Sequence, residues 1–220
     1  MPSTNIYENY SKQEMLDAAS LMPLDHLFTK KMARLINAYK NNYVHYQSIY
    51  SAQNALKLFN KAVLMNSNII KKLGNGGFSF VYEGIDNLVY KLSLSNEHED
   101  AWLFYARSSK KINNTLFPII HQLNVYNHDY CCKMEKLTKL DLRSADKQTL
   151  KAISISILKK DIDSSFHLIN TVGLVDYDSY SLWSAKLYTI MKRHTHLHFD
   201  FHQDNLMLRG QHLVITDPLS

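Results

Sequence analysis

The spacing of apolar residues changes twice along this chain of 220 residues, and these changes constrain its fold most strongly. Through residues 1–66, apolar residues recur three and four positions apart, the spacing of helices that bury one face. Residues 67–135 instead carry short apolar runs separated by turns, as strands do. Helical spacing returns in residues 136–220, which end in a short hairpin. The pattern predicts an α+β fold with a helical extension, a sheet carrying one helix, and a mainly helical remainder.

Local signals at the ends of the predicted elements set their bounds. A capping box, Ser11 to Glu14, precedes the first helix, and Ser95, Ser144 and Ser179 are placed to cap three later ones. The predicted strands cover residues 69–73, 78–84, 88–92, 117–125 and 129–134, and the hairpin joins 206–208 to 212–215. The helix after Ser95 is expected over about residues 97–110. The helix after Ser179 is expected to bury one face made of Leu182, Trp183, Leu187, Ile190 and Met191.

The composition argues against several classes of protein. Hydrophobic residues make up 45% of the chain, enough for a core, and no apolar run approaches membrane-spanning length. The net charge of +5 comes from dispersed lysines without a nucleic-acid motif, so no specific nucleic-acid partner is expected. The N-terminus lacks the pattern of a signal peptide. Cys131 and Cys132 are adjacent, a spacing that disfavours a bond between them, so reduced cysteines and a cytoplasmic location are expected.

A Gly-rich turn lies between the first two predicted strands. It comprises Gly74, Asn75, Gly76, Gly77, Phe78 and Ser79, and Val81 follows in the second strand. Such a turn lets the backbone approach a phosphate closely and donate N–H groups to it. A dinucleotide-binding loop opens a helix, whereas this turn leads into a strand, which disfavours a Rossmann fold. The turn is therefore a candidate ATP-binding loop, with an ordinary hairpin as the alternative.

Lys91 lies in the third predicted strand, where a single Lys among apolar residues is commonly a surface residue. In the third strand after a Gly-rich turn, it is also a candidate to contact the α- and β-phosphates of ATP. Glu97, Glu99 and Asp100 follow, and one of them is expected to pair with Lys91, although the sequence does not decide which. The fifth strand ends in a candidate adenine-binding hinge that includes Glu135 and Leu137, with a plain strand-to-helix connection as the alternative.

Three residues near the C-terminal end, Asp200, Asn205 and Asp217, have the spacing of a phosphoryl-transfer site. Asp200 would orient a hydroxyl nucleophile. Asn205 and Asp217 would supply oxygen ligands to Mg²⁺, a cation that prefers them. His202 is a candidate to contact the γ-phosphate of ATP, neutral or protonated according to the charges around it.

The same stretch permits a second interpretation as a zinc site. Residues 195–202 nearly match the Thr-His-x-His-x-Asp-His motif of the metallo-β-lactamase fold, but Phe201 separates Asp200 from His202. That fold also needs His and Asp ligands well downstream, and only 18 residues follow His202. Phosphoryl transfer is therefore the favoured interpretation.

Taken in order, the Gly-rich turn, the strand lysine and the C-terminal triad resemble the protein kinase fold over residues 67–220. More specifically, residues 73–79, 200–205 and 215–220 resemble the early host-shutoff serine/threonine protein kinases of podoviral phages. The resemblance implies a kinase small lobe at 67–135, a truncated large lobe at 136–220, and ATP and Mg²⁺ as cofactors. It also implies protein substrates in the cytoplasm of a bacterial host, including transcription and translation proteins.

The chain departs from the kinase pattern at its end. Asp217, Pro218 and Leu219 replace the usual Asp-Phe-Gly, and no activation segment or peptide-docking helices follow. Pro218 fixes φ and lacks an N–H, so the familiar Phe-driven switch is not expected. Ser220 is a candidate autophosphorylation site. Two alternatives remain open: a small-molecule phosphotransferase of the aminoglycoside or choline type, and a non-catalytic kinase-like protein that inhibits a host partner by binding.

Overall fold

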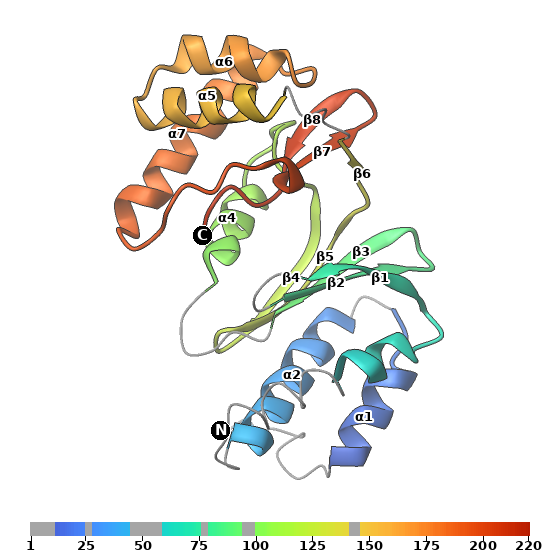
Figure 1. The fold of residues 1–220 in the computed structure, drawn as a ribbon. Coiled ribbons are helices and arrows are strands. Elements are labelled where there is room, and N and C mark those ends of the chain that lie inside the picture. The colour runs from blue at the N-terminus through green and yellow to red at the C-terminus, as the bar shows by residue number, and fades with distance from the viewer. Residues whose placement is uncertain (1–11, 25–27, 45–58, 76–78, 94–99, 141–145) are drawn as a thin grey trace. The chain divides into compact units, whose positions relative to one another are not determined.

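The structure, a computed structural model, describes residues 12–24, 28–44, 59–75, 79–93, 100–140 and 146–220. Within this part the fold is α+β, as predicted, with helices and two sheets (Figure 1). The chain divides into two compact units, residues 1–99 with 121–136 and residues 100–120 with 137–220. None of the helices in the described part is both long enough and apolar enough to cross a membrane.

The first unit is built on a five-stranded sheet in the order β1-β2-β3-β5-β4. Its strands are β1 (Ile69–Asn75), β2 (Ser79–Gly84), β3 (Leu88–Ser93), β4 (Ile120–Tyr126) and β5 (Asp129–Glu135). Asn87 and Asn127 take positive φ at the two tight turns, a conformation that Asn tolerates better than most residues. All five predicted strands are thus present. However, β4 begins at Ile120 rather than at 117, because Pro118 has no N–H to donate to a ladder.

Helices cover one face of this sheet with a single shared core (Figure 1). Helices α1 (Lys12–Leu21) and α2 (Phe28–Val44) and the helical residues 59–64 contribute to it. Their buried side chains pack against those of the sheet, which include Tyr82, Tyr90, Leu92 and Cys131. The Asn66 amide donates to the carbonyls of Ala19 (2.9 Å) and Met22 (2.8 Å), which fastens the helices where the sheet begins. The described helices of the predicted extension therefore share one core with the sheet. Ser11 lies outside the described residues.

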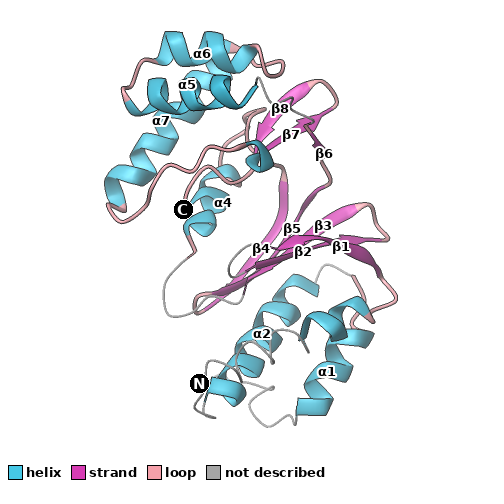
Figure 2. Cartoon of the chain, viewed as in Figure 1, coloured by secondary structure: helices cyan, strands magenta, loops and turns pink. Residues whose placement is uncertain are grey.

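The second unit combines helices with a small sheet (Figure 2). Its elements are α4 (Ala101–Ser109), β6 (Thr138–Lys139), α5 (Asp146–Leu158), α6 (Ile162–Asn170), α7 (Tyr177–Arg193), the 3₁₀ turn η1 (Gln203–Asn205), β7 (Leu206–Arg209) and β8 (His212–Ile215). The sheet order is β6-β7-β8 and both pairings are antiparallel. Its core includes Tyr105, Phe117, Trp183, Leu187 and Leu213. The predicted C-terminal hairpin is confirmed as β7 and β8.

Several predicted details of this unit are wrong. Helix α4 begins at Ala101 with Asp100 as its N-cap, later than predicted, while Ser95 and Ser144 lie outside the described residues. Helix α7 is capped by Asp176, whose carboxylate accepts from the Ser179 N–H at 2.7 Å, so Ser179 is the third helical residue rather than the cap. Leu182 is 48% exposed, so it lies outside the buried face of α7. Helix α6 and strand β6 were not predicted.

Candidate active site

Two segments of the second unit that bear the carboxylates of Asp200 and Asp217 run antiparallel to each other. The His198 N–H donates to the Ser220 carbonyl at 2.7 Å, and the Ser220 N–H donates back to the His198 carbonyl at 2.9 Å. The Asp200 N–H donates to the Pro218 carbonyl at 2.8 Å. The fold therefore brings the backbones at Asp200 and Asp217 together, although β7 and β8 separate them in sequence.

Asn205 joins these two segments. It is 8% exposed and closes the turn η1. Its side-chain nitrogen donates to the Asp200 carbonyl at 3.0 Å, and its own carbonyl accepts from the Thr216 N–H at 2.8 Å. Because the amide nitrogen is engaged in this way, the amide oxygen Oδ1 is the atom left to accept a hydrogen bond or bind a cation.

His202 lies beside Asp200 with its ring 47% exposed. Its Nε2 is 3.1 Å from the Asn205 side-chain nitrogen, and its Nδ1 is 3.3 Å from the Asp204 N–H nitrogen. A neutral imidazole has one acceptor nitrogen, so it can accept from only one of these donors at a time. When protonated, the ring would face the carboxylates of Asp200 at 3.7 Å and Asp204 at 3.8 Å. The His202 ring therefore lies within reach of two carboxylates and of two N–H donors.

Aromatic side chains that carry a hydrogen-bond donor support the backbone just before Asp217. Trp102 Nε1 donates to the Thr216 carbonyl at 3.1 Å, and the Tyr105 hydroxyl donates to the Ile215 carbonyl at 2.8 Å. Trp183 Nε1 donates in turn to the Tyr105 oxygen at 2.9 Å. Burial raises the pKa of Tyr105 well above its ordinary value, and the nearby charge of Asp217 acts in the same direction. The hydroxyl therefore stays a neutral donor at any ordinary pH.

These aromatic supports were not predicted from the sequence. Trp102 and Tyr105 are three positions apart on α4, which places them on one face of that helix. Both are large side chains that need a hydrogen-bond partner when buried. Their spacing was the available signal, but the sequence does not say which carbonyl groups they reach.

The donor atoms at this site suit a hard cation such as Mg²⁺. Asp217 offers a carboxylate, and Asn205 offers the amide oxygen that its hydrogen bond to Asp200 leaves available. Over the described ranges of the chain, no group of three or more His, Cys, Asp or Glu side chains is placed to hold a metal. The zinc interpretation of residues 195–202 therefore gains no support from the geometry, whereas a site made of one carboxylate, one amide and phosphate oxygens does not require such a group.

In the first unit, strand register places Lys91 on the sheet face opposite the helical core. Lys91 lies directly across from Val81 on β2 and Cys132 on β5. Its neighbours Tyr90 and Leu92 point the other way, into the core, because side chains alternate along a strand. Lys91 is 7% exposed, so it is a buried cation rather than the surface lysine of the alternative reading.

Glu83 lies on β2, on the same face of the sheet as Lys91. It is near the end of β2 that is farther from Ser79. It is buried and contacts Lys136 Nζ at 2.6 Å and Lys71 Nζ at 3.7 Å. The hydrogen bond from Lys136 holds the pKa of Glu83 below its ordinary value. Lys136 follows directly after β5, so this ion pair ties the start of the predicted hinge to the sheet. No local pattern in the sequence indicates this pairing.

The remaining predicted residues are placed as follows. Asp100 is the N-cap of α4, and its carboxylate accepts from the Trp102 N–H at 3.0 Å. Glu135 ends β5 opposite Leu88, and Leu137 follows one residue after Lys136. Gly74 and Asn75 end β1, Ser79 begins β2, and Ser220 is exposed; Gly76, Gly77, Phe78, Glu97 and Glu99 lie outside the described residues.

The candidate site residues therefore form two groups. Asp200, His202, Asn205 and Asp217 lie together in the second unit, while Val81 and Lys91 lie side by side in the first. Comparison of the chain with models of protein families and with curated proteins found no match.

Proposed function

We propose that this protein is a protein kinase that transfers the γ-phosphoryl group of Mg-ATP to Ser or Thr hydroxyls. A single observation carries the proposal. Asn205 holds the segments of Asp200 and Asp217 together, through its side chain to the Asp200 carbonyl and through its backbone to Thr216. One residue thus links the carboxylate that would orient the nucleophile to the carboxylate that would bind metal, which is the combination that phosphoryl transfer requires.

The proposed roles follow from the position of each group. Asp200, with a half-exposed carboxylate, orients the acceptor hydroxyl and takes its proton. The hydroxyl oxygen bonds to the γ-phosphorus while the bond from that phosphorus to the β–γ bridging oxygen breaks, so ADP leaves with that electron pair. Asp217 and the amide oxygen of Asn205 would hold Mg²⁺, which would supply positive charge to neutralise the phosphates. Lys91 supplies a fixed cation for the α- and β-phosphates, and His202 donates to the γ-phosphate.

The element order of the chain also supports a two-lobed kinase-like fold. Three strands, a helix and two further strands occur in the predicted order, with Lys91 on the third strand. The strand pair that carries Val81 and Lys91 follows the Gly-rich turn directly. Helices and the β7–β8 hairpin then form the second unit. In this proposal the first unit contains the small lobe, and the second unit belongs to the large lobe. Host transcription and translation proteins are the proposed targets.

Incubation of the purified chain with Mg-ATP and a bacterial lysate tests the proposal. We expect labelled phosphate on proteins, released as phosphoserine and phosphothreonine after acid hydrolysis. Mass spectrometry of the chain itself shows whether Ser220 is among the modified residues. Label found only on small molecules such as aminoglycosides or choline would instead identify a small-molecule phosphotransferase. Absence of transfer to any acceptor, with capture of a lysate protein, would favour the non-catalytic alternative.

A further inference from the structure

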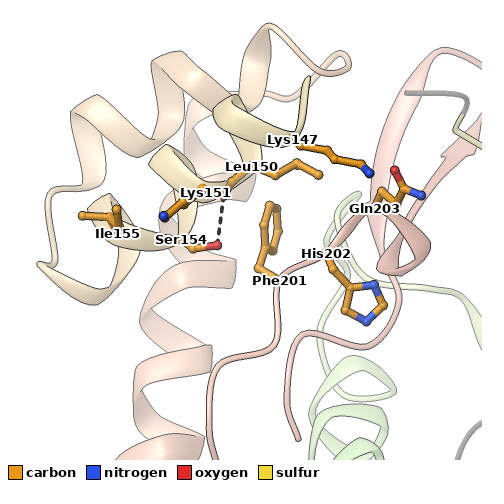
Figure 3. A pocket seen from close by; sticks show the side chains of 8 residues that line it. All are labelled: Lys147, Leu150, Lys151, Ser154, Ile155, Phe201, His202 and Gln203. Atoms are coloured by element: carbon orange, nitrogen blue, oxygen red, sulfur yellow. Dashed lines mark hydrogen bonds between the residues drawn. The ribbon is translucent and has the colours of Figure 1, made fainter. Parts of the chain in front are cut away.

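A pocket of about 370 Å³ lies within the second unit, next to the residue that orients the acceptor. Helix α5 lines one side with Lys147, Leu150, Lys151, Ser154 and Ile155, and the loop after Asp200 lines the other with Phe201, His202 and Gln203 (Figure 3). His202 lines the pocket, and its Nε2 lies 3.7 Å from the Asp200 carboxylate, so an occupant that contacts His202 lies near that carboxylate.

The pocket has an apolar floor and a basic rim. Leu150 and Phe201 are buried and face each other across the floor (Figure 3). The Ser154 hydroxyl donates to the Leu150 carbonyl at 2.9 Å, so its hydrogen is already used. Lys147 and Lys151 are exposed and stand one helical turn apart on the same side of α5. The pocket thus offers apolar contact in the middle and one cation at each end, because Lys147 Nζ and Lys151 Nζ point away from each other (Figure 3).

The positive charge at the rim is not neutralised by the residues that the structure describes. Among the residues whose side chains the structure describes, no carboxylate lines the pocket and no Asp or Glu forms an ion pair with Lys147 or Lys151. Nearby Lys139 shows the contrast, because it contacts Asp204 at 3.0 Å. Like charges four positions apart on a helix repel each other, so an anion placed between Lys147 and Lys151 would be attracted by both.

We propose that this pocket binds the polypeptide segment around the acceptor and selects acidic side chains beside the acceptor Ser or Thr. The proposal rests on the proposed kinase function and names its substrate class. An acidic peptide fits both parts of the lining, because its aliphatic atoms cover Leu150 and Phe201 while its carboxylates reach Lys147 and Lys151. The pocket volume suits a few side chains, within the range of ordinary ligand sites.

Peptide pairs test the selection. One peptide carries Asp and Glu around a single Ser, and its partner carries Asn and Gln at the same positions. We expect the full chain to phosphorylate the acidic peptide with a kcat/KM at least tenfold higher at low salt, and the difference should shrink as salt screens the charges. The double variant Lys147→Gln/Lys151→Gln should lower kcat/KM for the acidic peptide to the value for the neutral one. The control Lys159→Gln/Lys192→Gln removes two exposed charges outside the pocket and should keep the preference.

A binding measurement separates this inference from the proposed function. The same peptides with Ala in place of Ser are followed by fluorescence anisotropy, without ATP. We expect the acidic peptide to bind at least tenfold more tightly than the neutral one, and the Lys147→Gln/Lys151→Gln variant to lose that difference. Transfer without any acidic preference would overturn the inference and leave the kinase proposal standing. Acidic-peptide binding without transfer to any acceptor would support the pocket and overturn the kinase proposal. Equal binding of both peptides would overturn the inference.

Discussion

The two units hold their candidate catalytic groups by different means. Lys91 belongs to a regular ladder, with β2 on one side and β5 on the other. Asp200, Asn205 and Asp217 lie in irregular segments that are joined by individual hydrogen bonds and supported by Trp102, Tyr105 and Trp183. A ladder distributes its support over many bonds, whereas the loops depend on a few. Single substitutions of the residues that support the loops should therefore disturb the site more than single substitutions around Lys91.

The largest effect is expected at the two loop carboxylates. Asp200→Asn and Asp217→Asn should each lower the rate of phosphoryl transfer by about 100- to 1,000-fold, because each removes a charge that acts on the reacting groups. Transfer of labelled phosphate to lysate proteins measures this effect, and thermal unfolding checks that each variant is folded. A folded variant with more than a tenth of the original activity would contradict the role assigned to that carboxylate.

The next effect compares a lysine on each face of the five-stranded sheet. Lys91→Met should lower transfer about 100-fold, because the phosphates lose a fixed cation. Lys133→Met is the matched control, since Lys133 lies on the neighbouring strand β5 but on the face that carries Tyr90, where it pairs with Asp86 at 2.9 Å. We expect the control to keep its activity within about threefold. Equal losses of transfer activity in both variants would show that the loss does not depend on which face of the sheet carries the lysine. Activity should be compared at saturating ATP and at low ATP.

A smaller effect tests the hydrogen bonds of the Tyr105 hydroxyl, which support the backbone near Asp217. Tyr105→Phe should lower the free energy of unfolding by about 1–3 kcal/mol, because the Ile215 carbonyl loses its donor and Trp183 loses its acceptor in a buried place. Denaturant unfolding measures the change. Tyr177→Phe is the control, since that hydroxyl bonds to Asp163 on the surface and its loss should cost under about 0.5 kcal/mol. Similar costs for both would mean that Tyr105 does not support the loop.

The smallest effect concerns the cap of α7, the helix that carries Trp183. Asp176→Ala should cost about 1 kcal/mol at pH 7. The hydrogen bond from Ser179 holds the pKa of Asp176 below its ordinary value. The contribution is therefore fully present above the ordinary Asp pKa near 4 and is lost as pH falls through the lower folded value. The difference between wild type and variant, measured by denaturant unfolding, should shrink below about pH 4. A difference in unfolding free energy that stays constant down to pH 2 would show that the ionised carboxylate of Asp176 is not its cause.

The contrast between ladder and loop also explains what the sequence could predict. The register of Lys91 follows from alternation, because apolar Tyr90 and Leu92 must face the core and Lys91 must then face away. The spacing of Asp200, Asn205 and Asp217 indicated a site. By contrast, the bonds that join them run mostly through backbone carbonyls, which every residue has, so no residue type marks them.

The errors have a similar physical origin. Asp176 and Ser179 are both good caps and stand three positions apart, so the sequence permits either start for α7, and packing of the helix decides between them. Helix α6 is short and follows α5 after a brief turn, so the sequence pattern predicts a mainly helical region here without a separate helix. The pairing of Glu83 with Lys136 joins residues far apart in sequence, which no local pattern reveals.

One measurement tests the central claim most directly, namely the comparison of ATP labelled at the γ-phosphate with ATP labelled at the α-phosphate. Each is incubated with Mg²⁺, bacterial lysate and either the wild-type chain or Asp200→Asn. The proposed phosphoryl transfer predicts that proteins acquire the γ label and not the α label, and that Asp200→Asn removes the γ signal. Transfer of the α label would show that the nucleotide part is transferred instead. A γ signal that persists undiminished in the folded Asp200→Asn variant would contradict the site.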